Sequence, residues 1–267
     1  MTTRPDIAVL MPSYNPGDDL APTLASLRKQ TIPYHLFLVD DGSPRKPDYA
    51  AALAGLPHTL IELPKNVGIT GALNAGLAEI YKHDFKYIAR MDCGDEMTPD
   101  RLELQVAYLE AHPEIDIVGS WIEMVYTESN RRFVLAWPTE HEGITDRLWT
   151  NMSLSHPALT LRTSSLKALG DYSNEYDAAE DYELCRRAMK RSFKLHNIGK
   201  VLLLKTETRD SISWRKRRTQ LMSRWRIQWA YRNLANPRCL MGLVKTGLVL
   251  AVPDGLAPHL KAIVGTK

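Results

Sequence analysis

Acidic residues stand directly after two of the apolar runs in this sequence. Asp40 and Asp41 follow one run, and Asp92 and Asp95 follow another. Acidic residues at the carboxyl ends of strands point into the ligand crevice of an open α/β sheet. Two carboxylates there can hold a hard divalent cation, Mg²⁺ or Mn²⁺, that bridges a diphosphate. Each cluster alone is a good turn sequence, but the two together favour a binding site.

A third acidic pair, Glu180 and Asp181, opens a predicted helix over residues 180–191. A single carboxylate can take the proton from an acceptor hydroxyl as its oxygen attacks a carbon. The helix dipole favours the ionised form of Asp181, and Glu180 or local burial would restore its basicity. The alternative is that the pair merely caps the helix. No Ser-His-Asp or Cys-His set for covalent catalysis is apparent.

The elements that must position these carboxylates alternate along the chain. Continuous apolar runs predict strands, and apolar residues at helical spacing predict helices. In the first half the strands are 7–11, 35–39, 58–62 and 87–91, and the helices are 18–30 and 69–83. In the second half the strands are 115–125, 158–161 and 200–204, and the helices are 99–111, 140–150, 164–169 and 180–191. This alternation indicates an α/β fold with a mainly parallel sheet.

Charge and cysteine usage set the surroundings. The 267 residues carry a net charge of +3, yet Ser211–Pro253 holds nine Lys or Arg and no acidic residue. Such a segment suggests an anionic partner, either phospholipid or nucleic acid. The three scattered cysteines make neither a disulfide framework nor a zinc motif, so we expect a cytoplasmic protein.

The basic segment is predicted to be an amphipathic helical tail. Leu221, Met222, Trp225 and Trp229 recur at helical spacing, with basic residues largely on other faces. The later apolar run is shorter than the ~20 residues that a membrane span needs. We therefore expect residues 214–252 to lie on an anionic membrane surface. The alternative is that the stripe packs on the preceding domain. Nucleic acid is disfavoured because no recognised motif accompanies the charge.

Five ordered stretches resemble the family 2 glycosyltransferases of the GT-A fold, over roughly residues 5–215. They are VLMPSYN, LVDDGS, KNVGITGALNAGL, YIARMDCGDEMTPDRLELQ and SHPALTLRTSSLKALGDYSNEYDAAEDYELCRRA. The resemblance implies a Rossmann-like, mainly parallel sheet flanked by helices, as a catalytic domain over residues 1–210. Its nucleotide-binding half would be about 1–98 and its acceptor-side half about 99–210, followed by the tail, 211–267.

The resemblance also implies roles for the matching residues. Asp181 would be the general base, with Glu180 beside it, and His156 would contact the acceptor or donor sugar. The nucleotide would be bound by Pro12, Tyr14, Asp40, Asp41, Asn66, Gly68, Arg90 and Asp92. Asp92 and Asp95 would hold the divalent metal. Two positions depart from the pattern: Gly94 stands where an Asp is usual, and Thr208 where a His is common.

The expected function is inverting transfer of a hexose-type sugar, with UDP as the expected carrier, to a glycan or lipid-linked acceptor. The product would be a bacterial cell-surface polysaccharide, made at the inner face of the plasma membrane. One alternative is a degenerate homologue that binds nucleotide as a membrane-complex subunit. A nucleotidylyltransferase is disfavoured because SYNPGDD follows the first strand instead of a basic, Gly-rich loop.

Overall fold

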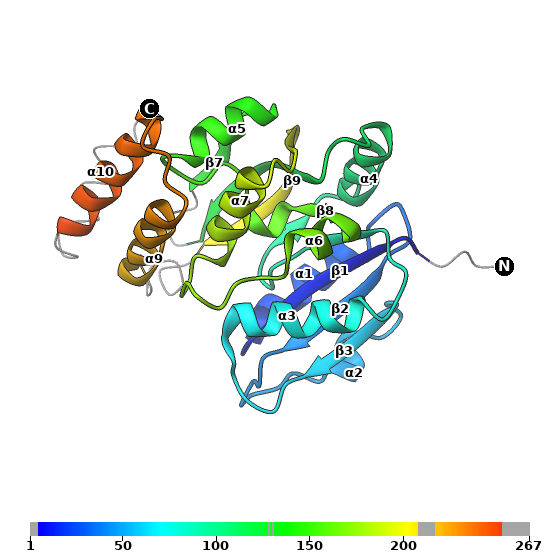
Figure 1. Cartoon of the computed structure of the whole chain (residues 1–267). Coiled ribbons are helices and arrows are strands. Elements are labelled where there is room, and N and C mark those ends of the chain that lie inside the picture. The colour runs from blue at the N-terminus through cyan, green and yellow to red at the C-terminus, as the bar shows by residue number, and fades with distance from the viewer. Residues whose placement is uncertain (1–4, 128, 130, 208–216, 253–267) are drawn as a thin grey trace.

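The computed structural model describes residues 5–127, 129, 131–207 and 217–252 as one sheet with helices on both faces (Figure 1). In this described part the sheet has nine strands, in the order β3-β2-β1-β4-β8-β6-β9-β5, with β7 paired to β6. The predicted α/β fold is confirmed. The sheet is more mixed than expected, because only the first half is parallel throughout.

The parallel half contains β1 (Ile7–Ser13), β2 (His35–Asp40), β3 (His58–Glu62) and β4 (Tyr87–Arg90). Successive side chains of a strand point to opposite faces, so each apolar run supplies two cores. Leu10 and Val39 pack beneath α3 (Gly68–Ile80). Met11 and Leu38 pack on the other face, beneath α1 (Leu20–Leu27). Two short helices, η1 (Gly17–Asp19) and α2 (Tyr49–Ala52), complete this half.

The second half extends the sheet beyond β4 mostly by antiparallel pairing. Its strands are β5 (Glu96–Met97), β6 (Ile117–Tyr126), β7 (Arg131–Leu135), β8 (Thr160–Arg162) and β9 (Leu195–Glu207). Its helices are α4 (Arg101–Ala111), α5 (His141–Leu148), η2 (His156–Ala158), α6 (Thr163–Leu169) and α7 (Glu180–Lys190). β8 joins the two halves because it pairs with both β4 and β6. α7 leads into β9, which lies beside β6 in the same sheet.

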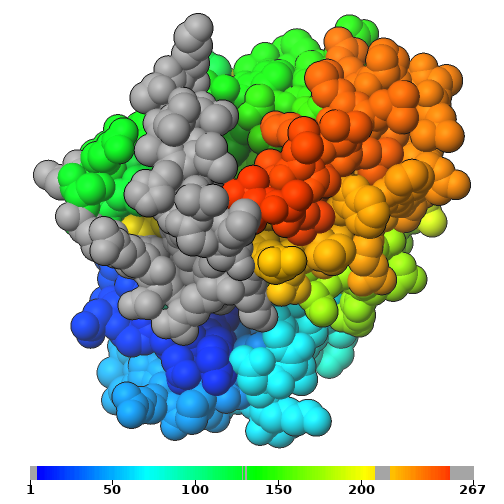
Figure 2. Space-filling model, turned by 90° about the vertical axis from the view of Figure 1, so that its left-hand side faces the viewer, coloured from blue at the N-terminus to red at the C-terminus, as the bar shows by residue number. Residues whose placement is uncertain are grey.

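Two C-terminal helices pack against this domain (Figure 1). α9 (Arg217–Ala230) buries Ser223, Ile227 and Gln228 and contacts α7. This inner face differs from the predicted apolar stripe, since Met222 and Trp229 remain 45% and 41% exposed. α10 (Pro237–Ala251) packs along α9 and lies on the surface of the molecule (Figure 2). Trp214 and Thr208 lie outside the described residues.

Gly242 is expected to control how α10 sits on the domain. A Cβ at this position would lie 2.0 Å from the Trp149 carbonyl oxygen, a backbone atom that cannot give way cheaply. Gly242→Ala should therefore lower the free energy of unfolding by about 1–3 kcal/mol. Gly247→Ala is the matched control on the same helix, because its nearest neighbour would be 3.9 Å away. Thermal or urea unfolding of both variants checks the difference, and equal stability would contradict it.

Candidate active site

The carboxyl end of β2 holds a loop in place through Asp41. Its two carboxylate oxygens accept hydrogen bonds from the backbone N–H groups of Val67 (2.7 Å) and Gly68 (3.0 Å). Gly42 permits this close approach, because at φ +68° a Cβ there would lie 2.3 Å from the Lys65 carbonyl carbon. The Asp-Gly pair thus clamps the loop before α3 against the end of the sheet. A nucleobase could hydrogen-bond to Asp41 only through the carboxylate lone pairs that these two bonds leave free.

The other residues predicted to bind the nucleotide lie at the same strand ends or in the loop that Asp41 holds. Pro12 is buried within β1, whereas Tyr14, just after the strand, is 49% exposed. Asn66 is exposed, and Gly68 begins α3 at φ +82°. Asp40 is buried at the end of β2, where one oxygen accepts a backbone N–H of the following turn. Tyr14 and Asn66 are therefore the exposed side chains of this set, and nucleotide binding by the buried Pro12 and Asp40 stays a prediction.

Arg90, at the end of β4, is a buried cation that ties several elements together. Its guanidinium donates to the carbonyl oxygens of Leu10 (3.2 Å) and Met91 (2.6 Å), and it forms an ion pair with Asp92. Burial alone would raise the Asp92 pKa, but Arg90 and Lys205 together with other neighbours outweigh it and lower the pKa to about 2. Arg90 is only 1% exposed, so its geometry suits holding Asp92 ionised and in place.

His156 lies on the other side of Arg90. Its Nε2 is 3.3 Å from the Arg90 Nε and 2.7 Å from the Tyr172 hydroxyl. An arginine can only donate, so Nε2 acts as an acceptor and the ring is neutral. Burial and the Arg90 charge lower the His156 pKa well below its usual range, in agreement. This placement favours a role in positioning Arg90, and a contact between His156 and sugar stays a prediction.

The turn after β4 is fixed by a threonine of α1. The Thr23 hydroxyl accepts the Gly94 N–H at 2.9 Å and donates to the Asp95 carbonyl oxygen at 2.8 Å. Gly94 adopts φ +100°, a conformation that side chains rarely allow. An aspartate at this position would be strained, which gives a physical reason why the expected acidic motif has glycine there.

Asp95 faces a lysine that sequence reasoning missed. The pairing of Glu96 with Leu204 between β5 and β9 brings Lys205 next to Asp95. Burial raises the Asp95 pKa to about 7, although Lys205 opposes the shift. Despite its own burial, Lys205 has a raised pKa because Asp95, Asp92 and other carboxylates surround it. The site thus contains a fixed ammonium group among its carboxylates.

Glu180 and Asp181 form the first turn of α7, as predicted. The preceding Ala178 has φ +56°, a strained conformation of the kind that clusters at functional sites. The Asp181 carboxylate accepts the Tyr182 N–H at 2.6 Å, and burial raises the Asp181 pKa. Burial, with the neighbouring Asp181 charge, raises the Glu180 pKa to about 7. Both carboxyl groups are therefore better proton acceptors than exposed ones, and the role of the pair in catalysis stays a prediction.

The strand-end carboxylates and the helix pair belong to one electrostatic site. Asp92 acts on both Glu180 and Asp181, and Lys205 acts on Asp181. Arg224 of α9 also lowers the Asp181 pKa, which places the C-terminal helix beside the site. Lys205 carries one signal in the sequence, as the first charged residue after the apolar run 201–204. Arg224 carries none, because it is one of many basic residues of the tail.

The fit of the site to a divalent cation depends on Asp92 and Asp95. Asp95 Oδ2 is buried and has no hydrogen-bond partner in the described part of the chain, and the Asp92 side chain is 32% exposed. Within the same residues, no group of three or more His, Cys, Asp and Glu could hold an ion. Mg²⁺ is commonly bound by one or two carboxylates together with phosphate oxygens and water. The two carboxylates fit a cation whose coordination a diphosphate completes, and not an independent metal centre.

Comparison with known proteins decides the family. Residues 8–170 match Glycosyl transferase family 2. The chain belongs to this family. A relative of this glycosyltransferase, the amylovoran biosynthesis glycosyltransferase AmsE of Erwinia amylovora, is 29% identical over 78% of the chain and 79% of the relative. The UDP-Gal:alpha-D-GlcNAc-diphosphoundecaprenol beta-1,3-galactosyltransferase of Escherichia coli is 26% identical over 74% of the chain and 73% of its own length.

Solved structures confirm the GT-A type of fold for this glycosyltransferase. TarS 1–349 of S. aureus, in complex with UDP-GlcNAc, matches with a TM-score of 0.66 at 20% identity, over 92% of this chain and 70% of TarS. The mannosyltransferase PcManGT of Pyrobaculum calidifontis, in complex with GDP-Man and Mn²⁺, matches with a TM-score of 0.63 at 17% identity, over 100% of this chain and 77% of PcManGT.

Proposed function

We propose that this glycosyltransferase moves a hexose-type sugar from a UDP donor to a glycan or lipid-linked acceptor, with inversion, in cell-surface polysaccharide synthesis. The observation that carries the proposal is the meeting of two carboxylate sets. Asp92 and Asp95 lie at the strand ends, and Glu180 and Asp181 open α7 within their electrostatic reach. One set suits the diphosphate of a donor, and the other suits a proton acceptor on the opposite side of the sugar.

The relatives support the donor and acceptor classes. The E. coli relative is named for a UDP-galactose donor and a diphosphoundecaprenol-linked acceptor. AmsE is named for the biosynthesis of amylovoran. TarS has been solved with UDP-GlcNAc and with UDP. These names favour a uridine nucleotide and an acceptor carried on lipid for this chain as well.

Asp181 acts on the acceptor in the proposed mechanism. Its carboxylate takes the hydroxyl proton while the hydroxyl oxygen forms a bond to the anomeric carbon. The bond from that carbon to the diphosphate oxygen breaks on the opposite face, and its electron pair leaves with the nucleoside diphosphate. Attack and departure on opposite faces invert the anomeric centre without a covalent enzyme intermediate.

Asp92, Asp95 and Lys205 act on the leaving diphosphate. A bound divalent cation would neutralise the negative charge that develops there. Asp92 is held ionised by Arg90 and is the stronger candidate ligand, whereas Asp95 offers its unpartnered oxygen, as far as the described residues show. The Lys205 ammonium supplies a further positive charge at a fixed place.

Calorimetric titration tests the proposed donor site. UDP, GDP and dTDP are titrated into purified protein, with and without Mn²⁺ or Mg²⁺. We expect UDP to bind most tightly, and with higher affinity when the metal is present. Binding without a metal effect would remove the cation from the mechanism. Failure of all three nucleotides to bind would contradict the proposal, and also the alternative of a degenerate homologue that binds nucleotide.

α10 is the part of the tail that supports the proposed membrane contact. No helix in the described ranges is long and apolar enough to cross a bilayer. α10 nevertheless presents an apolar row of Leu240, Met241, Val244 and Leu248, which are 48–66% exposed. Exposed Lys245 lies beside this row, and α9 and α10 contain no acidic residue. An apolar row flanked by cations fits the surface of an anionic leaflet. The proposed location is the inner face of the plasma membrane, where it would meet a lipid-linked acceptor.

Charged substitutions in this row test the contact. Val244→Glu and Leu248→Glu should each weaken binding to phosphatidylglycerol vesicles by roughly tenfold or more, because burial of a Val or Leu contributes about 1.5–3 kcal/mol. Val134→Glu is the matched control, since Val134 is 49% exposed on β7, outside the two C-terminal helices. Vesicle co-sedimentation measures binding. Unchanged binding of both α10 variants would contradict the contact.

A further inference from the structure

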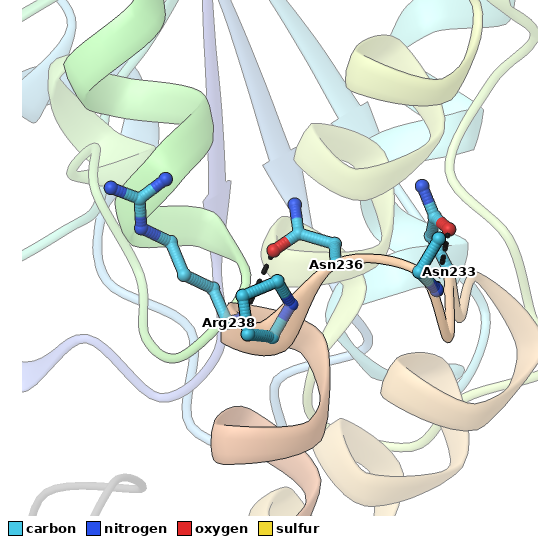
Figure 3. A pocket seen from close by; sticks show the side chains of 5 residues that line it. Asn233, Asn236 and Arg238 are labelled. Atoms are coloured by element: carbon cyan, nitrogen blue, oxygen red, sulfur yellow. Dashed lines mark hydrogen bonds between the residues drawn. The ribbon is translucent and has the colours of Figure 1, made fainter.

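Two hollows lie on the C-terminal helices. The first lies where the N-terminus of α10 is capped. It has a volume of about 580 Å³ and is lined by Asn233, Ala235, Asn236, Pro237 and Arg238, at the turn between α9 and α10 (Figure 3). Its polar side chains already have hydrogen-bond or ion-pair partners within the protein. Asn236 accepts the Arg238 N–H at 2.9 Å, Asn233 accepts the Ala235 N–H at 3.2 Å, and Arg238 pairs with Asp146 at 2.7 Å. This hollow is accounted for by the turn itself.

The second hollow is aromatic. It has a volume of about 420 Å³ and is lined by Tyr176, Trp225, Arg226 and Trp229. We call it the aromatic pocket. The two indole rings meet edge to face, 5.9 Å apart at 84°, and the Arg226 guanidinium lies 5.4 Å above the Tyr176 ring. Trp229 is 41% exposed, and the Arg232 guanidinium lies 5.6 Å from the centre of its ring. The pocket is therefore built before any ligand arrives.

Contacts along α7 place the aromatic pocket beside the general base. Tyr176 belongs to the segment that leads directly into Glu180 and Asp181. On the α9 side, Arg224 immediately precedes Trp225, lies 5.2 Å above the Tyr182 ring and acts electrostatically on Asp181. The pocket thus flanks the first turns of α7, on the C-terminal side of the base. The donor residues lie on the strand-end side.

The lining of the pocket matches a sugar ring better than other small ligands. Flat indole faces pack against the apolar C–H face of a pyranose, and an arginine offers several N–H donors to its hydroxyls. The hollow is a shallow, open feature of the surface, so a sugar ring would lie against its aromatic wall and not inside an enclosed cavity. Trp225 and Trp229 are four residues apart on α9, which holds both rings on one side of the helix.

We propose that the aromatic pocket is an acceptor subsite that binds a pyranose ring of the acceptor glycan, beyond the sugar whose hydroxyl Asp181 deprotonates. The inference rests on the proposed transferase function and extends it. It assigns the C-terminal helix α9 a part in acceptor recognition, in addition to any role of α10 at a membrane. Because the pocket would bind a sugar beyond the reacting one, its substitution should change acceptor affinity and leave donor binding unchanged.

Saturation-transfer NMR with defined sugars tests the subsite on the full chain. The probes are N-acetylglucosamine, cellobiose, lactose and N,N′-diacetylchitobiose, at millimolar concentration and in the presence of UDP. We expect at least one disaccharide to receive saturation on its ring C–H protons. Trp229→Ala should weaken this binding by roughly tenfold, and Trp229→Phe should keep most of it. Met222→Ala is the matched control, because Met222 is exposed on the same helix outside the pocket.

Three results would overturn the subsite. These are no saturation transfer to any of the four sugars, equal sugar affinity of the wild type and Trp229→Ala, or quenching by brominated lipid vesicles of the part of the fluorescence that Trp229→Phe lacks. The last would assign the pocket to the membrane face instead. UDP titration of the same samples separates this failure from failure of the proposed function. A wild type that binds UDP but no sugar contradicts only the subsite, whereas loss of UDP binding contradicts the transferase itself.

Discussion

Asp181→Asn is expected to lower the transfer rate by roughly 100- to 10,000-fold, the usual contribution of a general base. The amide keeps the shape of the carboxylate and can still accept the Tyr182 N–H, so the start of α7 should stay folded. It cannot take a proton from the acceptor. UDP affinity should stay nearly unchanged, because Asp181 acts on the acceptor side of the sugar. Initial rates and a UDP titration measure both quantities.

The controls for this prediction come from the same segment. Asp177→Asn alters an exposed carboxylate near α7 and should leave turnover close to wild type. The pH dependence gives a second check. A base must be ionised, so turnover falls as pH falls through its pKa, and burial raises the Asp181 pKa. The acidic limb of the wild-type profile should therefore lie above the ordinary aspartate range. Near wild-type turnover of Asp181→Asn would contradict the assignment of the base.

Asp95→Asn is expected to remove the effect of Mn²⁺ or Mg²⁺ on UDP affinity, a loss of roughly tenfold or more. Asp95 is the cleaner choice of the two candidate ligands. Asp92 forms an ion pair with the buried Arg90, so its substitution would also leave a charge unpaired and destabilise the fold. Asp95 Oδ2 has no hydrogen-bond partner within the described ranges, so an amide breaks no hydrogen bond of that oxygen, and Asp92 remains as a counter-charge to Lys205. Calorimetry with and without metal, together with the Mn²⁺ electron paramagnetic resonance signal, measures the loss.

Asp18→Asn is the matched control for the metal prediction, because Asp18 is an exposed carboxylate at η1. It should bind UDP and Mn²⁺ as the wild type does. Retention of the full metal effect in Asp95→Asn would contradict the role of Asp95. Asp92 would then be the main protein ligand of the cation.

The parallel half of the fold could be predicted closely from the sequence. The strand expected at 58–62 is His58–Glu62, and the one expected at 35–39 is His35–Asp40. β2 is buried on both faces and appears as a continuous apolar run, whereas β3 is an edge strand whose residues are half-buried or exposed. The strands β5 and β7 were missed. β5 has two residues and depends on β9 as its partner, and the described residues of β7 are largely exposed.

The sequence predicted those site residues whose type and position next to a predicted strand or helix indicate a function. It missed those that enter the site only through a contact with a distant segment. The Asp residues at strand ends and at the start of α7 could be identified from their position beside an apolar run or a predicted helix. Lys205 enters the site because β5 pairs with β9, a contact between segments far apart in the sequence. The tail shows the same limit. Its composition predicted amphipathic helices, but it did not indicate that α9 packs through Ser223 and Ile227 while Trp229 faces outward.

The configuration of the product tests the central claim most directly. UDP-glucose, UDP-galactose and UDP-GlcNAc labelled with ¹³C at the anomeric carbon are incubated with the enzyme, Mn²⁺ and a lipid extract that carries glycan acceptors. Anomeric ¹³C signals are then followed by NMR. The account predicts a β-linked product from one α-configured donor, and no product with Asp181→Asn. An α-linked product, or equal product formation by Asp181→Asn, would contradict an inverting transferase whose base is Asp181.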